Sequence, residues 1–161
     1  MITPMDLRPA TDEHLAAMID GRAPTSTLQV PPGGVDDPAT LELVRRGASE
    51  MRENGVLGAW MMVADGEVVG LCGFKGVPTA DGSVEIGYGV APARRRRGHA
   101  TEAVRRLIAE ARRLGVRVVT AETEGGNGPS ERVLERNGFR AVGRREVEGE
   151  AFRDWALRLV R

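Results

Sequence analysis

The segment from Ser83 to Thr123 constrains the fold more than any other part of the sequence. Strands are predicted over Ser83 to Val90 and over the valine-rich stretch Val116 to Thr123. A helix is predicted between them, over Gly98 to Leu114, because apolar residues recur there at the spacing of one buried stripe: Val104, Leu107, Ile108, Ala111 and Leu114. A strand, a helix and a second strand in this order predict two parallel strands joined by a crossover, and therefore a mixed α/β fold.

The rest of the chain predicts further strands and helices around this unit. Before it, we expect a strand over Met5 to Pro9 and a helix from Thr11-Asp12 to Asp20. A loop over Pro24 to Pro38 then leads to a second helix, from Asp37-Pro38 to about Asn54-Gly55. Two strands follow, Ala59 to Ala64 and Glu67 to Phe74, which the turn Asp65-Gly66 joins. After it, we expect a brief helix over Pro129 to Asn137 and a hairpin of Phe139 to Val147 with Ala151 to Val160, turning across Glu148-Gly149-Glu150. The 161 residues are the size of one domain.

Composition argues against several kinds of site. The 23 basic and 23 acidic residues give a net charge of zero, so no overall field steers the chain to nucleic acid or to an anionic membrane. Cys72 is the single cysteine, and His14 and His99 are far apart, so neither a disulfide nor a metal site is expected. Because no apolar stretch approaches about 18 residues and no signal peptide is recognisable, we expect a cytoplasmic protein with no membrane partner.

A strongly basic turn separates the central strand from the long helix. After Val90 come a proline, four arginines and Gly98, and the helix then begins with small residues up to Thr101. The N-terminus of a helix exposes unpaired N–H groups and partial positive charge, so it favours a phosphate. Gly98 lets the backbone approach an anion closely, and the arginines can add charge-assisted hydrogen bonds. The segment Val90 to Thr101 therefore predicts a pyrophosphate site.

Other interpretations of the basic turn are weaker. Four arginines can be a solvated run before a surface helix, but here a strand, a proline, a glycine and a helix coincide with them. A nucleic-acid site is disfavoured by the zero net charge and by only 4% aromatic residues. Gly87-x-Gly89 leads into Pro92 rather than into a helix, so it is no dinucleotide fingerprint, and the sequence contains no Gly-Lys-Ser/Thr for a P-loop.

Three segments in this order resemble the GNAT superfamily of N-acetyltransferases. Arg95-Arg96-Arg97-Gly98-His99-Ala100 resembles its Arg/Gln-x-x-Gly-x-Gly/Ala pyrophosphate motif. Asn127-Gly128-Pro129-Ser130, followed by Val133-Leu134-Glu135-Arg136-Asn137-Gly138-Phe139, is similar to the branch that contains the ribosomal-protein alanine and serine N-terminal acetyltransferases. With Glu85-Ile86-Gly87-Tyr88, the resemblance covers about Val68 to the C-terminus, and the first 60 residues share only the strand–helix–helix pattern.

The resemblance implies a fold, a cosubstrate and a reaction. It implies a single GNAT domain over residues 1–161, with a central, mostly antiparallel sheet flanked by helices. It implies that acetyl-CoA donates an acetyl group directly, in a ternary complex, to a primary amine, either a protein N-terminus or a small amine. The residues implied to hold acetyl-CoA are Val90, Arg95, Arg96, Arg97, Gly98, His99, Ala100, Thr101, Asn127 and Ser130.

The resemblance also suggests catalytic residues. Glu85 aligns with the general base of one branch, and a Glu of the closing hairpin, Glu146 or Glu148, is the alternative. A backbone N–H near Val90 would stabilise the oxyanion, and Gly87 and Gly89 suggest a β-bulge there. Many GNAT enzymes protonate the thiolate with a tyrosine where this chain has Leu134, so Ser130 is the candidate donor.

Structural explanations exist for each of these residues. Glu85 can be a carboxylate that pairs with an arginine or lies exposed on the outer sheet face, Ser130 can be a cap of its short helix, and Asn127 can be a turn residue. Gly87 and Gly89 can instead relieve crowding against the long helix. Tyr88 is expected to line the pocket, and Cys72 to pack in the core. A CoA-binding regulatory domain without catalysis and a basic nucleic-acid adaptor are the rival functions, and a homodimer is left open.

Overall fold

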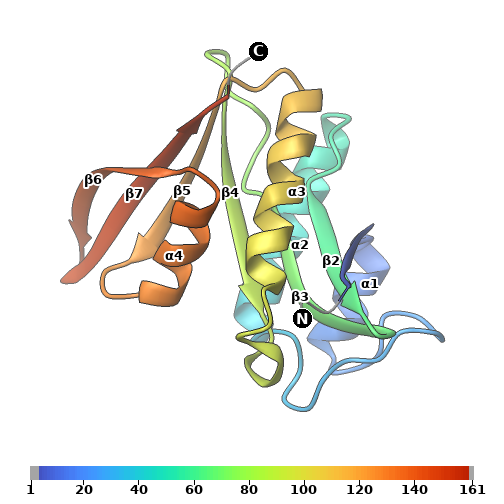
Figure 1. Cartoon of the computed structure of the whole chain (residues 1–161). Coiled ribbons are helices and arrows are strands. Elements are labelled where there is room, and N and C mark those ends of the chain that lie inside the picture. The colour runs from blue at the N-terminus through green and yellow to red at the C-terminus, as the bar shows by residue number, and fades with distance from the viewer. Residues whose placement is uncertain (1–3, 160–161) are drawn as a thin grey trace.

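The computed structural model describes residues 4–159 and contains every predicted strand and helix (Figure 1). In chain order these are β1 (Asp6–Pro9), α1 (Asp12–Ile19), α2 (Pro38–Glu53), β2 (Ala59–Ala64), β3 (Glu67–Phe74), β4 (Ser83–Val90), the 3₁₀ turn η1 (Pro92–Arg94), α3 (His99–Arg113), β5 (Val118–Glu124), α4 (Gly128–Arg136), β6 (Arg140–Val147) and β7 (Glu150–Arg158). Strand β5 begins at Val118 rather than Val116, and η1 was not predicted. The predicted end of the last strand, Val160, lies outside the described residues.

The strands form one sheet in the order β1-β2-β3-β4-β5-β7-β6. Every neighbouring pair is antiparallel except β4 and β5, which are parallel and are joined through α3. The predicted fold class, a mixed and mostly antiparallel sheet flanked by helices, is confirmed.

Local chemistry explains where the elements begin and turn. Thr11 caps α1, and the Asp37 side chain accepts a hydrogen bond from the Thr40 N–H at the start of α2. Asp65 and Gly66 both have positive φ, 51° and 73°, as the predicted two-residue hairpin requires. Glu148 and Gly149 form the same kind of turn, so Glu150 begins β7 and is not part of the turn.

Helices cover both faces of the first half of the sheet. In Figure 1, α3 lies in front of the sheet and α2 lies behind it. The front core joins fully buried side chains of α3, such as Val104 and Leu107, to the sheet and to Leu134 of α4. The rear core joins α1 and α2 to β2 and β3 through residues such as Leu15, Leu41 and Met61.

Strands β4 and β5 separate along their length. They pair only at their first residues, where Ser83, Val84 and Glu85 lie opposite Val118, Val119 and Thr120. Beyond Glu85, β4 pairs with β3 alone, and β5 pairs with β7 alone. The two strands diverge toward their carboxyl ends (Figure 1). We call the gap between residues 86–90 and 121–124 the β4–β5 opening.

No helix within residues 4–159 is both long enough and apolar enough to cross a membrane.

Candidate active site

The edge of β4 that faces the opening carries free backbone groups. The N–H of Ala91 donates to the Val69 carbonyl at 2.8 Å, and the N–H of Lys75 donates to the Glu85 carbonyl at 2.8 Å. Backbone groups of successive residues point to opposite edges of a strand. Tyr88 and Val90 therefore direct their N–H and C=O groups away from β3 and into the opening, where no described strand pairs with β4. A ligand in the opening can form strand-like hydrogen bonds with them.

The predicted bulge at Gly87 and Gly89 is wrong. The β3–β4 ladder runs without a register shift from Phe74↔Ile86 to Gly70↔Val90. Both glycines face the side of the sheet opposite α3, so they do not relieve crowding against that helix either. They make room for two charged side chains instead. A Cβ on Gly87 would lie 3.0 Å from Lys75 Cε, and one on Gly89 would lie 3.4 Å from Asp36 Oδ2.

The four arginines of the basic turn differ in their contacts. Arg94 donates to both carboxylate oxygens of Glu67, at 2.6 and 3.0 Å, and so fastens the turn to β3. Arg95 donates from Nε to the Val90 carbonyl at 3.3 Å. Arg95, Arg96 and Arg97 are exposed and form no ion pair within the described chain. Arg96 adopts a left-handed conformation, with φ of 65°, which is uncommon for a non-glycine residue.

The start of α3 lies directly after this turn and has no side-chain cap. Gly98 occupies the cap position with φ of 81°, and the Glu102 N–H makes the first intrahelical bond, to the Gly98 carbonyl at 3.1 Å. The N–H groups of His99, Ala100 and Thr101 thus have no acceptor within the helix. Together with the three exposed arginines they bring N–H donors and positive charge to one place, an arrangement that suits an anion.

The His99 ring does not take part in that surface. The residue is 2% exposed, and neither ring nitrogen has a hydrogen-bond partner in the described structure. Burial, helped by the charge of Arg97, lowers the pKa of His99, so the ring is neutral at neutral pH. Since the ring is buried, only the backbone of His99 can face the basic turn.

Ser130 and Tyr88 meet across the opening. The Tyr88 hydroxyl lies 2.8 Å from Ser130 Oγ and donates to the Ser130 carbonyl at 3.1 Å. Asn127 caps α4, because its Oδ1 accepts from the Ser130 N–H at 3.2 Å, so Ser130 is not the cap. Burial raises the pKa of Tyr88, although the hydrogen bond with Ser130 opposes this. No local signal in the sequence indicates this contact, because the two residues are 42 positions apart.

The candidate bases lie apart from the Val90 end of the opening. Glu85 sits where β4 and β5 still pair, and its Oε2 is 3.2 Å from Lys75 Nζ, which also lies 3.8 Å from Glu122. This arrangement matches the ion-paired alternative, with a lysine as the partner. Glu146 and Glu148 are exposed on β6 and its turn, and β7 and β5 separate β6 from β4. Leu134 is fully buried in the core.

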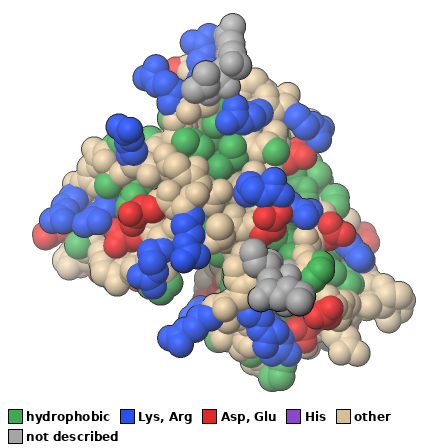
Figure 2. All heavy atoms as spheres, viewed as in Figure 1, with side chains coloured by type: hydrophobic (Ala, Val, Ile, Leu, Met, Phe, Trp, Pro, Cys, Tyr) green, Lys and Arg blue, Asp and Glu red, His purple; other side chains and the backbone are tan. Residues whose placement is uncertain are grey.

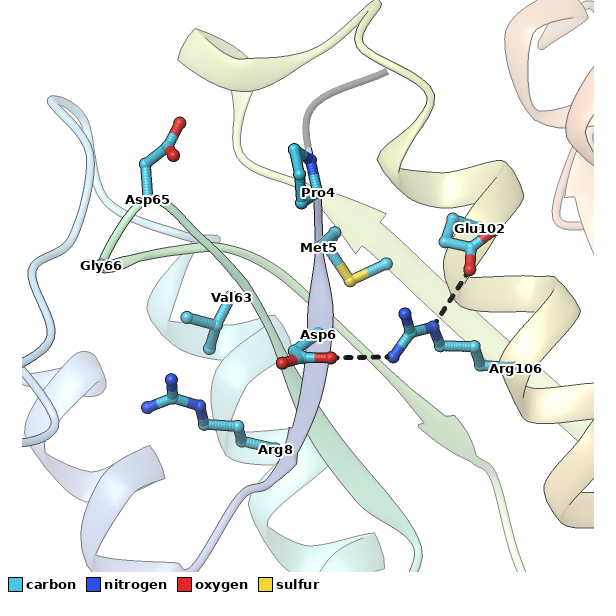
Figure 3. A pocket seen from close by; sticks show the side chains of 9 residues that line it. All are labelled: Pro4, Met5, Asp6, Arg8, Val63, Asp65, Gly66, Glu102 and Arg106. Carbon is cyan, nitrogen blue, oxygen red and sulfur yellow. Dashed lines mark hydrogen bonds and ion pairs between the residues drawn. The ribbon is translucent and has the colours of Figure 1, made fainter.

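A second hollow lies beside β1 and the first turns of α3 (Figure 3). Its volume is about 480 Å³, and Arg106 spans it from Glu102 to Asp6 with contacts of 3.1 Å to each. Its charges are largely paired, and it shares no lining residue with the opening. Within residues 4–159 no group of three or more metal-ligating side chains occurs.

The surface around the opening is basic. Figure 2 shows Lys and Arg side chains on both sides of the hollow that divides the front of the molecule. Besides Arg95, Arg96 and Arg97, the α4 residues Arg132 and Arg136 are exposed. Positive charge flanking an opening with free backbone groups suits a ligand that is both anionic and rich in amides.

Known proteins share this architecture. The chain matches the acetyltransferase (GNAT) domain model over residues 5–140. The uncharacterized N-acetyltransferase YjdG of Bacillus subtilis (strain 168) is 37% identical over 94 residues, which are 55% of this chain and about half, 56%, of that relative's length. The structure of Mycobacterium smegmatis RimJ in complex with CoA-disulfide superposes with a TM-score of 0.69 at 25% identity, covering 96% of this chain and 81% of that one. Salmonella typhimurium yncA, with its cofactor acetyl-CoA, gives a TM-score of 0.69 at 21% identity, covering 97% and 94%. The chain therefore belongs to the GNAT acetyltransferase family.

Proposed function

We propose that this protein transfers an acetyl group from acetyl-CoA to a primary amine by direct attack in a ternary complex. The observation that carries the proposal is the free edge of β4. Tyr88 and Val90 direct their backbone groups into the β4–β5 opening, where the Val90 carbonyl accepts only from the exposed Arg95 side chain among residues 4–159. The strand leads straight to three arginines that form no ion pair within the described residues and to the uncapped N-terminus of α3. An extended amide chain that ends in a pyrophosphate matches this succession of groups.

The residues present fit acetyl-CoA along this path. The pyrophosphate would accept hydrogen bonds from the N–H groups of residues 98–101 and from Arg95, Arg96 and Arg97. The pantetheine amides would pair with the edge of β4 at Tyr88 and Val90. The Oδ1 of Asn127 caps α4, so the side-chain NH₂ is the group of Asn127 that would donate to the pantetheine part of acetyl-CoA.

The reaction needs a neutral amine, an oxyanion donor and a proton for the departing thiolate. The amine nitrogen attacks the thioester carbonyl, the C–N bond forms and the C–S bond breaks. Two protons leave the nitrogen of the ammonium form, one to the thiolate sulfur and one to solvent through a base. The Val90 N–H would donate to the developing oxyanion. Ser130, hydrogen-bonded to Tyr88, would supply the proton for the thiolate.

The base and the acceptor are further parts of the proposal. The sequence suggests Glu85 first and Glu148 second for the base, but Glu85 is ion-paired with Lys75 and neither residue lies at the Val90 end of the opening. A protein N-terminus and a small amine are both candidate acceptors.

Release of free thiol from acetyl-CoA in the presence of an amine panel tests the proposal. We expect amine-dependent thiol release and an acetylated product identified by mass. Leu134 is fully buried and stands where many GNAT enzymes have the tyrosine that protonates the thiolate. This favours one rival, a domain that binds CoA without transferring an acetyl group. Thermal stabilisation by CoA with no thiol release from any amine would support that rival and overturn the proposal.

A further inference from the structure

The loop between α1 and α2 brings a carboxylate onto β4 at the opening. Asp36 Oδ2 lies 3.4 Å from the position that a Cβ on Gly89 would occupy, on the sheet face opposite α3. Any larger residue at position 89 would compete with the carboxylate for this space. Gly89 is the neighbour of Val90, so Asp36 lies next to the residue whose N–H faces the opening.

The two carboxylate oxygens of Asp36 differ in their partners. Oδ1 accepts a hydrogen bond from the Asp37 N–H at 2.8 Å, whereas no N–H donor or cation bonded to Oδ2 occurs among residues 4–159. The charged groups near the carboxyl group are Asp37 and Arg95 of the basic turn. Although Asp36 as a residue is exposed, burial of its carboxyl group against β4 raises its pKa. The Asp37 carboxylate is bound to Thr40, and it also raises the pKa of Asp36 by its charge and by a hydrogen bond between the two carboxyl groups.

Glu85, on the same face of β4, is in a different position. It is ion-paired with Lys75, whose stem covers Gly87. It is also five residues from Val90, which is about 16 Å along a strand at about 3.3 Å per residue. Asp36 is therefore the carboxylate of this face that is both close to Val90 and without a bound cation.

We propose that Asp36 binds the ammonium group of the acceptor beside Val90 and takes its proton before the amine attacks the thioester. This inference rests on the proposed acetyl transfer and identifies its acceptor class. The proton moves from the ammonium nitrogen to Oδ2, which leaves a neutral amine and a carboxylic acid that later releases the proton to solvent. Because Asp36 and Asp37 make this approach acidic, the acceptor is an ammonium without a neighbouring carboxylate, as in a protein N-terminus or an aliphatic polyamine.

The test compares wild type with Asp36→Asn and Asp36→Glu. Asparagine keeps the hydrogen bond from the Asp37 N–H through Oδ1 and removes only the charge and the basicity. Asp20→Asn is the matched control, because Asp20 is an exposed aspartate of the same inter-helix segment, paired only with exposed Arg22. Thiol release is measured with L-alaninamide, spermidine and L-alanine, and the affinity for acetyl-CoA is measured separately.

We expect Asp36→Asn to lower kcat/KM for the preferred amine by about a hundredfold, the effect of losing a general base. Asp36→Glu should recover part of it, while acetyl-CoA affinity and the Asp20→Asn rates stay unchanged. The acidic limb of the wild-type pH–rate profile should disappear in Asp36→Asn, which a purely structural role would not cause. Preference between L-alaninamide and spermidine separates the two acceptor sources, and L-alanine should react poorly.

Three outcomes would overturn the inference. Wild-type kinetics and pH dependence in Asp36→Asn would remove Asp36 from the reaction and leave acetyl transfer standing. Equal use of L-alanine and L-alaninamide would refute the acceptor class. Absence of thiol release by the wild type with every amine would refute the proposed function itself, and the role of Asp36 with it.

Discussion

The four consecutive arginines have different surroundings, so their substitution should have different consequences. Arg95 and Arg97 are exposed and without ion pairs within the described residues, beside the uncapped start of α3. We expect the double change of Arg95 and Arg97 to Ala to raise KM for acetyl-CoA by tenfold or more, since charge-assisted hydrogen bonds contribute about 1.5–3 kcal/mol each. KM for the amine should change much less. Steady-state kinetics with both substrates varied measures this.

Arg94 provides the contrasting variant. Its two hydrogen bonds to Glu67 are partly buried, so Arg94→Ala should lower the free energy of unfolding by about 1–3 kcal/mol and change acetyl-CoA binding less than the double variant does. Denaturant unfolding measures the first effect. An Arg95/Arg97 double variant with unaltered cofactor affinity would contradict the assignment of the pyrophosphate site.

The role of the Tyr88 hydroxyl can be tested by a single substitution. Tyr88→Phe keeps the ring in the core and removes only the group that contacts Ser130. Because burial raises the pKa of Tyr88, the hydroxyl stays protonated at neutral pH and can support Ser130 as a proton donor. We expect kcat to fall by about tenfold or more with KM for acetyl-CoA nearly unchanged.

Ser130→Ala should resemble Tyr88→Phe, and the double variant should lose little more than either single one, because the two groups act as a unit. Equal kcat in wild type and Ser130→Ala would show that water, rather than Ser130, protonates the thiolate and that Tyr88 acts only in packing.

At the scale of elements, α3 is fastened to β1 by charge. Glu102 accepts hydrogen bonds from Arg105 Nε at 2.9 Å and from Arg106 Nε at 3.1 Å, and Arg106 also reaches Asp6 (Figure 3). These bonds, that from Arg105 foremost, lower the pKa of Glu102 from its ordinary 4.5 to about 2. Since the folded pKa is depressed, the stabilisation is complete above about 4.5 and is lost as the pH falls toward 2.

Glu102→Gln should therefore destabilise the protein by about 1 kcal/mol at neutral pH, the value of a partly exposed pair. The difference in free energy of unfolding from wild type should shrink between pH 4.5 and pH 2. Glu110→Gln, which loses only the exposed contact with Arg113 on the same helix, is the matched control. A difference that does not change with pH would show that the effect comes from packing.

Local signals made the elements predictable, whereas contacts between distant segments were not. The caps at Thr11 and Asp37 and the turn Asp65-Gly66 each depend on a few adjacent residues, so the sequence indicates them directly. The divergence of β4 from β5 depends on which residues pair across the sheet, and nothing local to Glu85 marks the last pair.

In the candidate site too, features of adjacent residues could be predicted and contacts between distant residues could not. The proximity of the basic turn to the start of α3 could be predicted, because the two are contiguous in sequence. The pairing of Arg94 with Glu67, the meeting of Tyr88 with Ser130 and the position of Asp36 on Gly89 could not, because each joins segments far apart in the chain. Both expectations for the glycines of β4, a bulge and relief of crowding against the long helix, were wrong, because the groups packed against them are the side chains of Lys75 and Asp36.

At the scale of the whole molecule, the sheet has two halves with a narrow connection. Three residues of β4 pair with three of β5, and the strands then separate. Side-chain contacts also cross between the halves: Tyr88 with Ser130, Asn137 with the Thr101 carbonyl at 3.2 Å, Thr120 Oγ1 with the Val84 carbonyl at 3.5 Å, and Lys75 with Glu122 at 3.8 Å. A ligand that fills the opening would add hydrogen bonds to both halves, so its binding should stabilise the molecule as a unit.

Amide exchange along β4 can detect this ligand residue by residue. We expect CoA to slow exchange of the Tyr88 and Val90 amides, which face the opening, and to leave Gly87 and Gly89 unchanged, because their amides already face β3. At a CoA concentration of about 100 Kd the added stability is about 2.7 kcal/mol, which corresponds to a rise in Tm of roughly 5–10 °C for a chain of this size. A single-stranded oligonucleotide of equal charge should produce neither effect. Protection confined to the start of α3 would mean that only the pyrophosphate is bound, and the pantetheine arm would then have to lie outside the β4–β5 opening.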